Sequence, residues 1–188
     1  MPSLPSNAVL LVIDVQQGFN DPSWGNRNNP HAEENIARLL EVWRRTDHPI
    51  IHIQHLSKEE HSVLRADSPG SQFKEQAQPQ AHELIIQKSV NSAFIGTHLE
   101  QILRTHHFDT LVIVGLTTDH CVSTTTRMAG NLGFQTYVVS DATATFERTG
   151  HDGRTYTAQE IHDVSLVSLN HEFATVVGTQ SIIEMLSD

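Results

Sequence analysis

The sequence is poor in cysteine, in positive charge and in long apolar runs, and each shortage excludes a class of protein. A single cysteine among 188 residues excludes an intramolecular disulfide bond and predicts a reduced, cytoplasmic chain. Twelve Lys and Arg residues against 22 Asp and Glu residues give a net charge of −10, and no basic cluster offers a face for nucleic-acid phosphates. The longest apolar run, residues 8–13, is too short to cross a membrane, and no basic leader precedes it. We therefore expect neither nucleic acid nor a membrane as a partner.

The sequence also lacks an internal repeat and any linker rich in Pro, Gly or Ser. We predict a single domain over residues 1–188, which is long enough to bury a sizeable core. Charged residues make up 18% of the chain, below the usual quarter, which favours a body that also buries surface in a homo-oligomer.

Apolar runs and helical spacing alternate along the chain. Short apolar runs predict strands at residues 8–13, 50–53, 83–87, 111–114, 135–139 and 173–177. Apolar residues at helical spacing predict helices at residues 31–46, 98–106, 122–132, 157–169 and 181–186. Long irregular loops are predicted at residues 20–30 and 56–83, near a substrate mouth, and a shorter loop at 141–146. This alternation predicts an α/β fold with a parallel sheet covered on both faces.

The stretch at residues 111–122 predicts a strand, a tight turn and a helix that starts at or just after Cys121. Four apolar residues form the strand, Gly115 ends it, and residues 117–119 are types that commonly cap a helix. A thiol at a helix start meets unpaired backbone N–H groups and the positive end of the helix dipole, which favour its thiolate and can bind an oxyanion. A lone cysteine is more often a small buried apolar residue, so Cys121 needs partners to count as a nucleophile.

Three predicted strands end on different ionisable residues. Asp14 follows the first strand, Lys88 follows the third, and Cys121 lies a short turn beyond the fourth. The ends of parallel strands meet at one edge of a sheet, so we expect these side chains to converge. A carboxylate there can take the thiol proton and return it to a leaving amine, while an ammonium stabilises the thiolate. The sequence thus predicts Asp14, Lys88 and Cys121 as a catalytic triad.

Thirteen histidines raise the question of a metal, but their spacing does not support one. The sequence has neither an H-E-x-x-H motif nor a Cys/His zinc pattern. His52 and His55 are three residues apart in a strand-like run, so they are expected to point to opposite faces. We therefore predict no metal and no other cofactor.

Four segments together resemble the isochorismatase-like cysteine hydrolases, which include nicotinamidases, N-carbamoylsarcosine amidase and isochorismatase. The matching segments are LVIDVQ at residues 11–16 with Phe19, Lys88 followed by residues 92–94 and 96–97, GLTTDHCV at residues 115–122, and DAT at residues 141–143. The resemblance covers nearly the whole chain and implies a three-layer α/β/α sandwich with a six-stranded parallel sheet. It also implies the same triad, a cis peptide bond before Thr117, and an oxyanion hole formed by the N–H groups of Thr117 and Cys121. Members of this family act on small molecules and usually assemble as dimers or tetramers.

The chain departs from the nicotinamidases, which resemble one another in a metal-binding Asp-x-His motif after the second strand. Residues 54–57 are Gln, His, Leu and Ser here, so the aspartate and the following histidine are absent. The resemblance therefore implies neither the metal nor nicotinamidase activity. Only His55 and His61 remain for a weak metal site.

Three functions stay open at this point. The leading hypothesis is a metal-independent hydrolase that cleaves a C–N bond of a small amide, imide or carbamoyl compound through a thioester on Cys121. The alternative is an isochorismatase-type vinyl-ether hydrolase, in which the aspartate and the lysine matter more than the thiol. The third is a non-enzymatic interaction protein, although nothing structural requires Asp, Lys and Cys at three strand ends.

The substrate pocket is predicted from residues in the loops beside the triad. The predicted lining residues are Gln16, Phe19, Trp24, Asn91, Phe94, Thr118 and Phe146, with Tyr156 as a weaker candidate. An aromatic, partly dry pocket strengthens the electrostatic interactions inside it.

Overall fold

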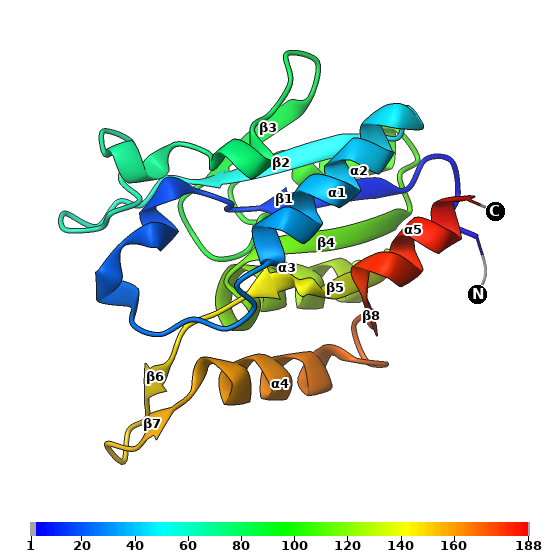
Figure 1. Cartoon of the computed structure of the whole chain (residues 1–188). Coiled ribbons are helices and arrows are strands. Elements are labelled where there is room, and N and C mark those ends of the chain that lie inside the picture. The colour runs from blue at the N-terminus through cyan, green and yellow to red at the C-terminus, as the bar shows by residue number, and fades with distance from the viewer. Residues whose placement is uncertain (1–2, 188) are drawn as a thin grey trace.

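The computed structural model describes residues 3–187, which are built around a parallel β-sheet (Figure 1). Its strands are β1 (Val9–Ile13), β2 (Ile50–His55), β3 (Leu84–Lys88), β4 (Thr110–Leu116), β5 (Gln135–Ala144) and β8 (Thr175–Val177). They follow the order β3-β2-β1-β4-β5-β8, and all neighbouring pairs are parallel. Two further strands, β6 (Arg148–Thr149) and β7 (Thr155–Tyr156), form a separate antiparallel hairpin. The six-stranded parallel sheet predicted from the sequence is confirmed.

Helices cover both faces of this sheet. Their bounds are Ala32–Arg45 for α1, Leu99–Thr105 for α2, Ser123–Asn131 for α3, Ala158–Leu169 for α4 and Thr179–Ser187 for α5. In Figure 1, α1 and α5 lie on the face turned toward the viewer, while α2 and α3 lie behind the sheet. The resulting three-layer α/β/α arrangement confirms the predicted fold class.

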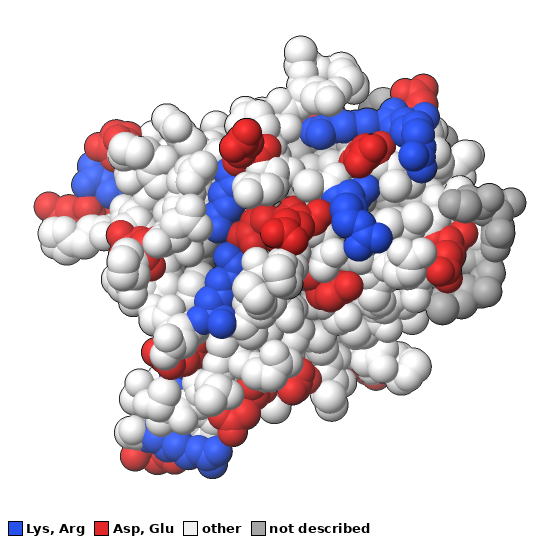
Figure 2. All heavy atoms as spheres, in the orientation of Figure 1, with Lys and Arg blue, Asp and Glu red and all other residues white. Residues whose placement is uncertain are grey.

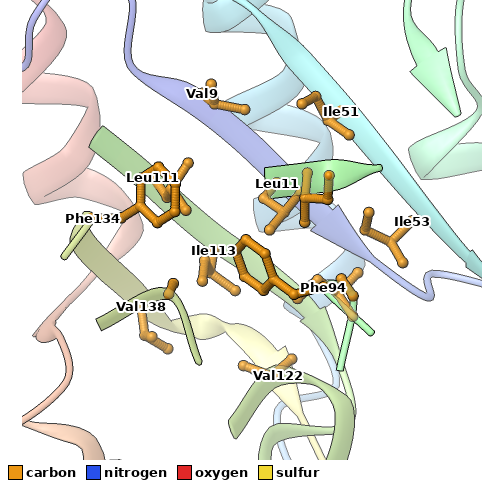
Figure 3. Packing of buried hydrophobic residues seen from close by; sticks show 14 of the residues in the cluster. Val9, Leu11, Ile51, Ile53, Phe94, Leu111, Ile113, Val122, Phe134 and Val138 are labelled. Atoms are coloured by element: carbon orange, nitrogen blue, oxygen red, sulfur yellow. The ribbon is translucent and has the colours of Figure 1, made fainter. Parts of the chain in front are cut away.

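The central strand β1 shows why the sheet needs a layer of helices on each face. Its five residues, all apolar, are completely buried. Leu10 and Val12 belong to the core under α1 and α5, whereas Leu11 and its odd-numbered neighbours belong to the opposite core. Figure 3 shows Val9 and Leu11 in that second core, with Leu11 near Ile113 of the neighbouring strand. A strand that is apolar on both faces is stable only between two layers, which is the pattern of parallel sheets.

Helix α1 follows its amphipathic sequence. Ile36, Leu39, Leu40 and Trp43 are fully buried against the sheet, and the Trp43 indole Nε1 donates a hydrogen bond of 3.0 Å to the carbonyl of Ala8. That bond satisfies the only polar atom of the indole. The helix therefore fixes the start of β1, and through it the position of Asp14 at the other end of the strand.

Strand β5 is longer than the sequence predicts. We expect a loop over residues 141–146, but β5 continues to Ala144. The register with β4 shifts, since Ile113 pairs with Val138 while Gly115 pairs with Thr143. Gly115 has φ +122°, and a Cβ there would overlap the carbonyl oxygen of Ile13. A glycine thus lets β1 and β4 approach closely where they end at the active-site edge.

The two long loops are attached to α1 by a buried charge cluster. Glu33, on α1, accepts hydrogen bonds from Arg27 Nη1 at 2.7 Å and from Lys74 Nζ at 2.6 Å. Arg27 lies in the first loop and Lys74 in the second, and both Glu33 and Lys74 are buried. Burial raises the pKa of Glu33, but the hydrogen bonds from Arg27 and Lys74 outweigh it and hold the pKa at about 2.

Replacing Glu33 with glutamine is expected to lower the free energy of unfolding at pH 7 by about 3 kcal/mol, because two cations would lose their buried counter-charge. The folded-state pKa of Glu33 is below its ordinary value of 4.5, so its contribution is present above pH 4.5. The contribution is lost as the pH falls toward 2, and the difference between the two proteins should shrink over that range.

Urea unfolding of the wild type and Glu33→Gln between pH 7 and pH 3 measures this difference. The matched control is Glu34→Gln, because Glu34 is the next residue on α1 but is exposed, and within residues 3–187 its one ion-pair partner is His31. Equal stabilities for Glu33→Gln and Glu34→Gln at pH 7 would show that the cluster does not hold the loops.

The surface agrees with the charge balance of the sequence. On the face covered by α1 and α5, basic side chains are interspersed with acidic ones (Figure 2). The described residues of this face therefore form no continuous basic stripe of the kind that nucleic-acid phosphates require. None of the helices within residues 3–187 is long and apolar enough to cross a membrane.

Candidate active site

Three strand ends bring the predicted triad to one edge of the sheet. Asp14 directly follows β1, Lys88 is the last residue of β3, and Cys121 lies in the turn that follows β4. Strand β2 separates β1 from β3, and its last residue, His55, pairs with Lys88 in the sheet register. The parallel topology thus places four chemically active residues on neighbouring strand ends.

The Lys88 ammonium contacts both other members of the triad. Lys88 Nζ is 2.6 Å from Asp14 Oδ2 and 3.2 Å from Cys121 Sγ. The side chains of Asp14 and Lys88 are completely buried, whereas Cys121 is 7% exposed. The ion pair is therefore shielded from water, and the sulfur reaches the surface of a cavity.

One oxygen of the Asp14 carboxylate is free to accept a hydrogen bond or a proton. Its Oδ2 atom accepts from Lys88, while its buried Oδ1 atom has no hydrogen-bond partner among residues 3–187. One oxygen of Asp14 and Cys121 Sγ lie within 4.8 Å of each other. A buried carboxylate oxygen without a partner is a strong acceptor, and the Cys121 thiol near this carboxylate is the candidate proton donor to it.

Two opposing effects act on the pKa of the Cys121 thiol. The position before a helix favours a thiolate, but burial and then the Asp14 charge raise the pKa of the Cys121 thiol, and the Lys88 ammonium offsets only part of this. Desolvation penalises the charged form more than the helix start favours it. The Cys121 thiol is therefore protonated at rest and needs a base, which is the role that the sequence predicts for a neighbouring carboxylate.

The turn that carries Cys121 is wider than an α-helical turn. Residues Thr118–Val122 form one π-helical turn, in which the N–H of Val122 donates to the carbonyl of Thr117 at 3.2 Å, and α3 begins only at Ser123. The peptide bond between Leu116 and Thr117 is cis, as the family resemblance implies. Turns of this kind occur frequently at functional sites.

Side chains from later in the sequence hold this turn in place. The hydroxyl of Thr118 forms a hydrogen bond of 2.9 Å with Nδ1 of His162, a buried residue of α4. The Asp119 carboxylate accepts from the hydroxyl of Thr145 and, at 3.1 Å, from Nε of Arg148. Helix α4, the residue that follows β5 and strand β6 therefore contact the turn at the two residues that follow Thr117.

A cavity of about 620 Å³ opens onto the sulfur. It is lined by Asp14, Phe19, Trp24, His55, Ser57, Lys58, Glu59, Ser62, Leu64, Ser89, Val90, Asn91, Thr117, His120 and Cys121. Three of the seven predicted substrate-binding residues are in this lining, namely Phe19, Trp24 and Asn91. Asn91 Nδ2 lies 3.9 Å from Cys121 Sγ, so its amide is directed at the sulfur.

Aromatic rings build one wall of this cavity. The rings of Phe19 and Trp24 are 5.1 Å apart, and Phe146 stacks on Trp24 at 5.4 Å. The Trp24 indole is fixed by a hydrogen bond of 2.9 Å from Nε1 to the carbonyl of Gly18. The Phe19 and Trp24 rings are tilted by 37° relative to each other, so they form an apolar wall whose Trp24 ring is held in one orientation.

The other four predicted lining residues lie outside the lining, because each has a different structural partner. Gln16 is fully buried and exchanges hydrogen bonds with the main chain of His55. Phe94 points into the core beside Ile113 (Figure 3). The Thr118 hydroxyl is taken up by His162, and Phe146 supports Trp24 from behind.

The sequence suggests only a weak metal-binding role for His55, whereas the structure places it among the residues of the candidate site. It lines the cavity, and its Nδ1 atom is 3.0 Å from Lys88 Nζ. His52, three residues earlier, is completely buried and bonds Glu83 instead. The available signal was the end of a strand, since the last residue of β2 lies at the same edge as Asp14 and Lys88.

The donor atoms of Asp14, His55 and Cys121 lie close enough together to suggest a metal, within 4.8 Å of one another. The Lys88 ammonium, however, already lies 2.6, 3.0 and 3.2 Å from one atom of each. A metal ion bound by these three groups would meet a buried positive charge at contact distance. The set therefore fits the ammonium and does not fit a divalent metal, and His61 is an exposed residue outside the cavity lining.

Comparisons with known proteins agree with this fold. The chain matches the family model described as "Isochorismatase domain" over residues 8–181. It is 50% identical over 174 residues to the isochorismatase family protein YrdC of Bacillus subtilis, with 93% of each chain covered.

Solved structures and more distant relatives point the same way. A crystal structure from Chromobacterium violaceum, assigned to the isochorismatase family, has a TM-score of 0.97 at 43% identity and covers 100% of this chain and 97% of that one. The chain is also 25% identical over 194 residues to the maleamate amidohydrolase of Pseudomonas putida, covering 94% of this chain and 85% of that protein. These matches show that the chain, with its cysteine in the turn after β4 and its buried Asp–Lys pair, belongs to the isochorismatase family, a family of cysteine hydrolases.

Proposed function

We propose that the protein hydrolyses the C–N bond of a small amide, imide or carbamoyl compound through a thioester on Cys121. The observation that carries this proposal is the position of Lys88 Nζ, 2.6 Å from Asp14 Oδ2 and 3.2 Å from Cys121 Sγ, at the base of a cavity. A nucleophile and a base that share one buried cation are arranged for proton transfer between them. The name of the Pseudomonas putida relative, maleamate amidohydrolase, supports the choice of a C–N bond.

Acylation begins with the neutral thiol. Asp14 takes the proton from Cys121 Sγ as the sulfur forms a bond to the substrate carbonyl carbon. The carbonyl oxygen becomes an oxyanion, for which the N–H groups of Thr117 and Cys121 are the proposed donors, each worth roughly 3 kcal/mol in comparable enzymes. When the C–N bond breaks, Asp14 returns its proton to the leaving nitrogen, and a thioester remains.

Deacylation repeats the same proton transfers with water. Asp14, again a carboxylate, takes a proton from a water molecule that attacks the thioester carbon. Collapse of the second oxyanion breaks the C–S bond, and the proton on Asp14 returns to the sulfur. Lys88 stabilises the thiolate while it exists and the Asp14 carboxylate at the beginning and the end.

The test is a panel of small amides, imides, carbamoyl compounds and isochorismate, assayed for ammonia release and product formation. Intact-protein mass spectrometry during turnover should detect an acyl adduct, and because the chain has one cysteine, its site is unambiguous. Release of ammonia with an adduct on Cys121 is the expected result. Turnover of isochorismate alone, retained in Cys121→Ala, would instead support vinyl-ether hydrolysis, and no turnover of any compound would support a non-enzymatic role.

A further inference from the structure

His55 has no role in the steps above, yet it touches the centre of the site. It is the last residue of β2, between the strands that lead to Asp14 and Lys88. Its Nδ1 atom lies 3.0 Å from Lys88 Nζ, and its side chain lines the cavity. A half-buried imidazole in contact with a buried ammonium calls for a physical explanation, because two cations at this distance would repel.

The contacts of Lys88 supply that explanation. An ammonium has three N–H donors, and the three atoms around Lys88 Nζ are Asp14 Oδ2, His55 Nδ1 and Cys121 Sγ. Two of these acceptors change charge during the proposed reaction, since Asp14 gains a proton when Cys121 loses one. His55 is the acceptor that can stay unchanged throughout the cycle.

We propose that His55 is a positioning residue that holds the Lys88 ammonium between Asp14 and Cys121. The inference rests on the proposed function, because the position of Lys88 matters only if Cys121 acts as a nucleophile. To accept from Lys88, Nδ1 must carry no proton, so the imidazole is the tautomer with its proton on Nε2.

The main chain of His55 is clamped to the segment that carries Asp14. Gln16, two residues beyond Asp14, accepts from the N–H of His55 at 2.8 Å and donates to its carbonyl at 2.9 Å. Gln16 is fully buried and also donates to the carbonyl of Ser71 at 2.8 Å. The ring therefore extends from a fixed backbone, which is what a positioning residue requires.

The charges that face His55 favour its neutral form. Burial first, and then the Lys88 ammonium, lower the pKa of His55 below its ordinary value of 6.5, while Asp14 and Glu59 act in the opposite direction. The fourth neighbour, Cys121, is a neutral thiol at rest. His55 is therefore uncharged at neutral pH, the state in which Nδ1 can accept a hydrogen bond.

A matched pair of substitutions separates the acceptor from the bulk of the side chain. The Oδ1 atom of asparagine can take the place of the histidine Nδ1, whereas glutamine carries its amide one methylene further out. Neither side chain titrates, and both are polar. His55→Asn should therefore keep the acceptor for Lys88, and His55→Gln should lose it.

The readout is the rate of alkylation of Cys121 by iodoacetamide at pH 8, which depends on the thiolate fraction and needs no substrate. Because Cys121 is the single cysteine, the mass increase of the whole protein reports this thiol alone. We expect His55→Asn to react within about twofold of the wild type. We expect His55→Gln to react about tenfold more slowly, the effect of one unit of thiol pKa, because a displaced Lys88 no longer stabilises the thiolate. His61→Asn, in an exposed loop position, is the control for histidine loss.

Equal rates for His55→Asn and His55→Gln would overturn the inference, whether both are fast or both are slow. Melting temperatures measured on the same samples show whether a slow variant is simply unfolded. Suppose that His55→Asn is alkylated quickly and His55→Gln slowly, but that the protein turns over no compound of the panel. This result would remove the proposed hydrolysis and still support the placement of Lys88 by His55. Turnover of a panel compound together with equal alkylation rates for the two variants would support the proposed hydrolysis and remove the positioning role of His55.

Discussion

Replacing Cys121 with serine is expected to lower kcat/KM for the amide substrate by at least about 10⁴-fold, because loss of the nucleophile removes the covalent route. The hydroxyl of serine holds its proton much more tightly than a thiol does, and Asp14 is the only base proposed for it. The side chain is nearly isosteric and buried, so the fold should survive with a melting temperature within a few degrees.

Cys121→Ala is the second variant, because alanine has neither a nucleophilic atom nor an ionisable side-chain proton, whereas serine keeps a hydroxyl group. Both variants should release no ammonia above the uncatalysed rate, and neither should form an adduct in the mass spectrum. Substantial ammonia release by Cys121→Ala from a correctly folded protein would rule out the thioester mechanism.

The second large effect is expected on stability. Replacing Lys88 with methionine should lower the free energy of unfolding by about 3–5 kcal/mol, because it leaves the completely buried Asp14 carboxylate without its cation. The double variant Asp14→Asn with Lys88→Met removes both charges and should recover most of that loss. Turnover should be absent in both proteins.

Urea unfolding at pH 7 of the wild type, both single variants and the double variant forms a double-mutant cycle for the pair. Recovery of stability without recovery of activity would show that the ion pair is kept for its chemistry, since a neutral pair of similar size packs at least as well. A cost below about 1 kcal/mol for Lys88→Met would mean that the buried pair is not formed in solution.

The sequence was most informative where a residue type, a strand end and a chain-wide pattern agree. The apolar run before Asp14 and the run before Cys121 predict buried parallel strands, and parallel strands share an edge. From those facts the convergence of Asp14, Lys88 and Cys121 follows without coordinates, and the observed contacts of Lys88 match it.

What the sequence could not supply depends on through-space partners. The pocket lining depends on which side chain each loop residue bonds, and Gln16 and Thr118 turn out to have internal partners in His55 and His162. The strand order places His55 beside Lys88, and this contact cannot be predicted from the spacing of histidines along the chain.

The protonation of Cys121 belongs to the same class of property. A helix start favours the thiolate by a local effect that can be inferred from sequence. Burial and the charge of Asp14, 107 residues earlier in the chain, act against it and can be seen only in the folded protein. The sequence therefore predicts the neighbours of Cys121, but it does not show how burial and charge together set the protonation of the thiol.

The central claim is that Asp14 activates a thiol that is protonated at rest, and the ionisation of Cys121 tests it most directly. Absorbance at 240 nm, measured from pH 6 to pH 10 as wild type minus Cys121→Ser, reports the thiolate of the single cysteine. Because burial and Asp14 raise the thiol pKa, we predict that the wild type shows no rise in absorbance from thiolate formation at or below pH 8. In Asp14→Asn the thiolate should form at a lower pH than in the wild type, although this variant should be inactive. A thiolate already present at pH 7 in the wild type, unchanged in Asp14→Asn, would contradict the account.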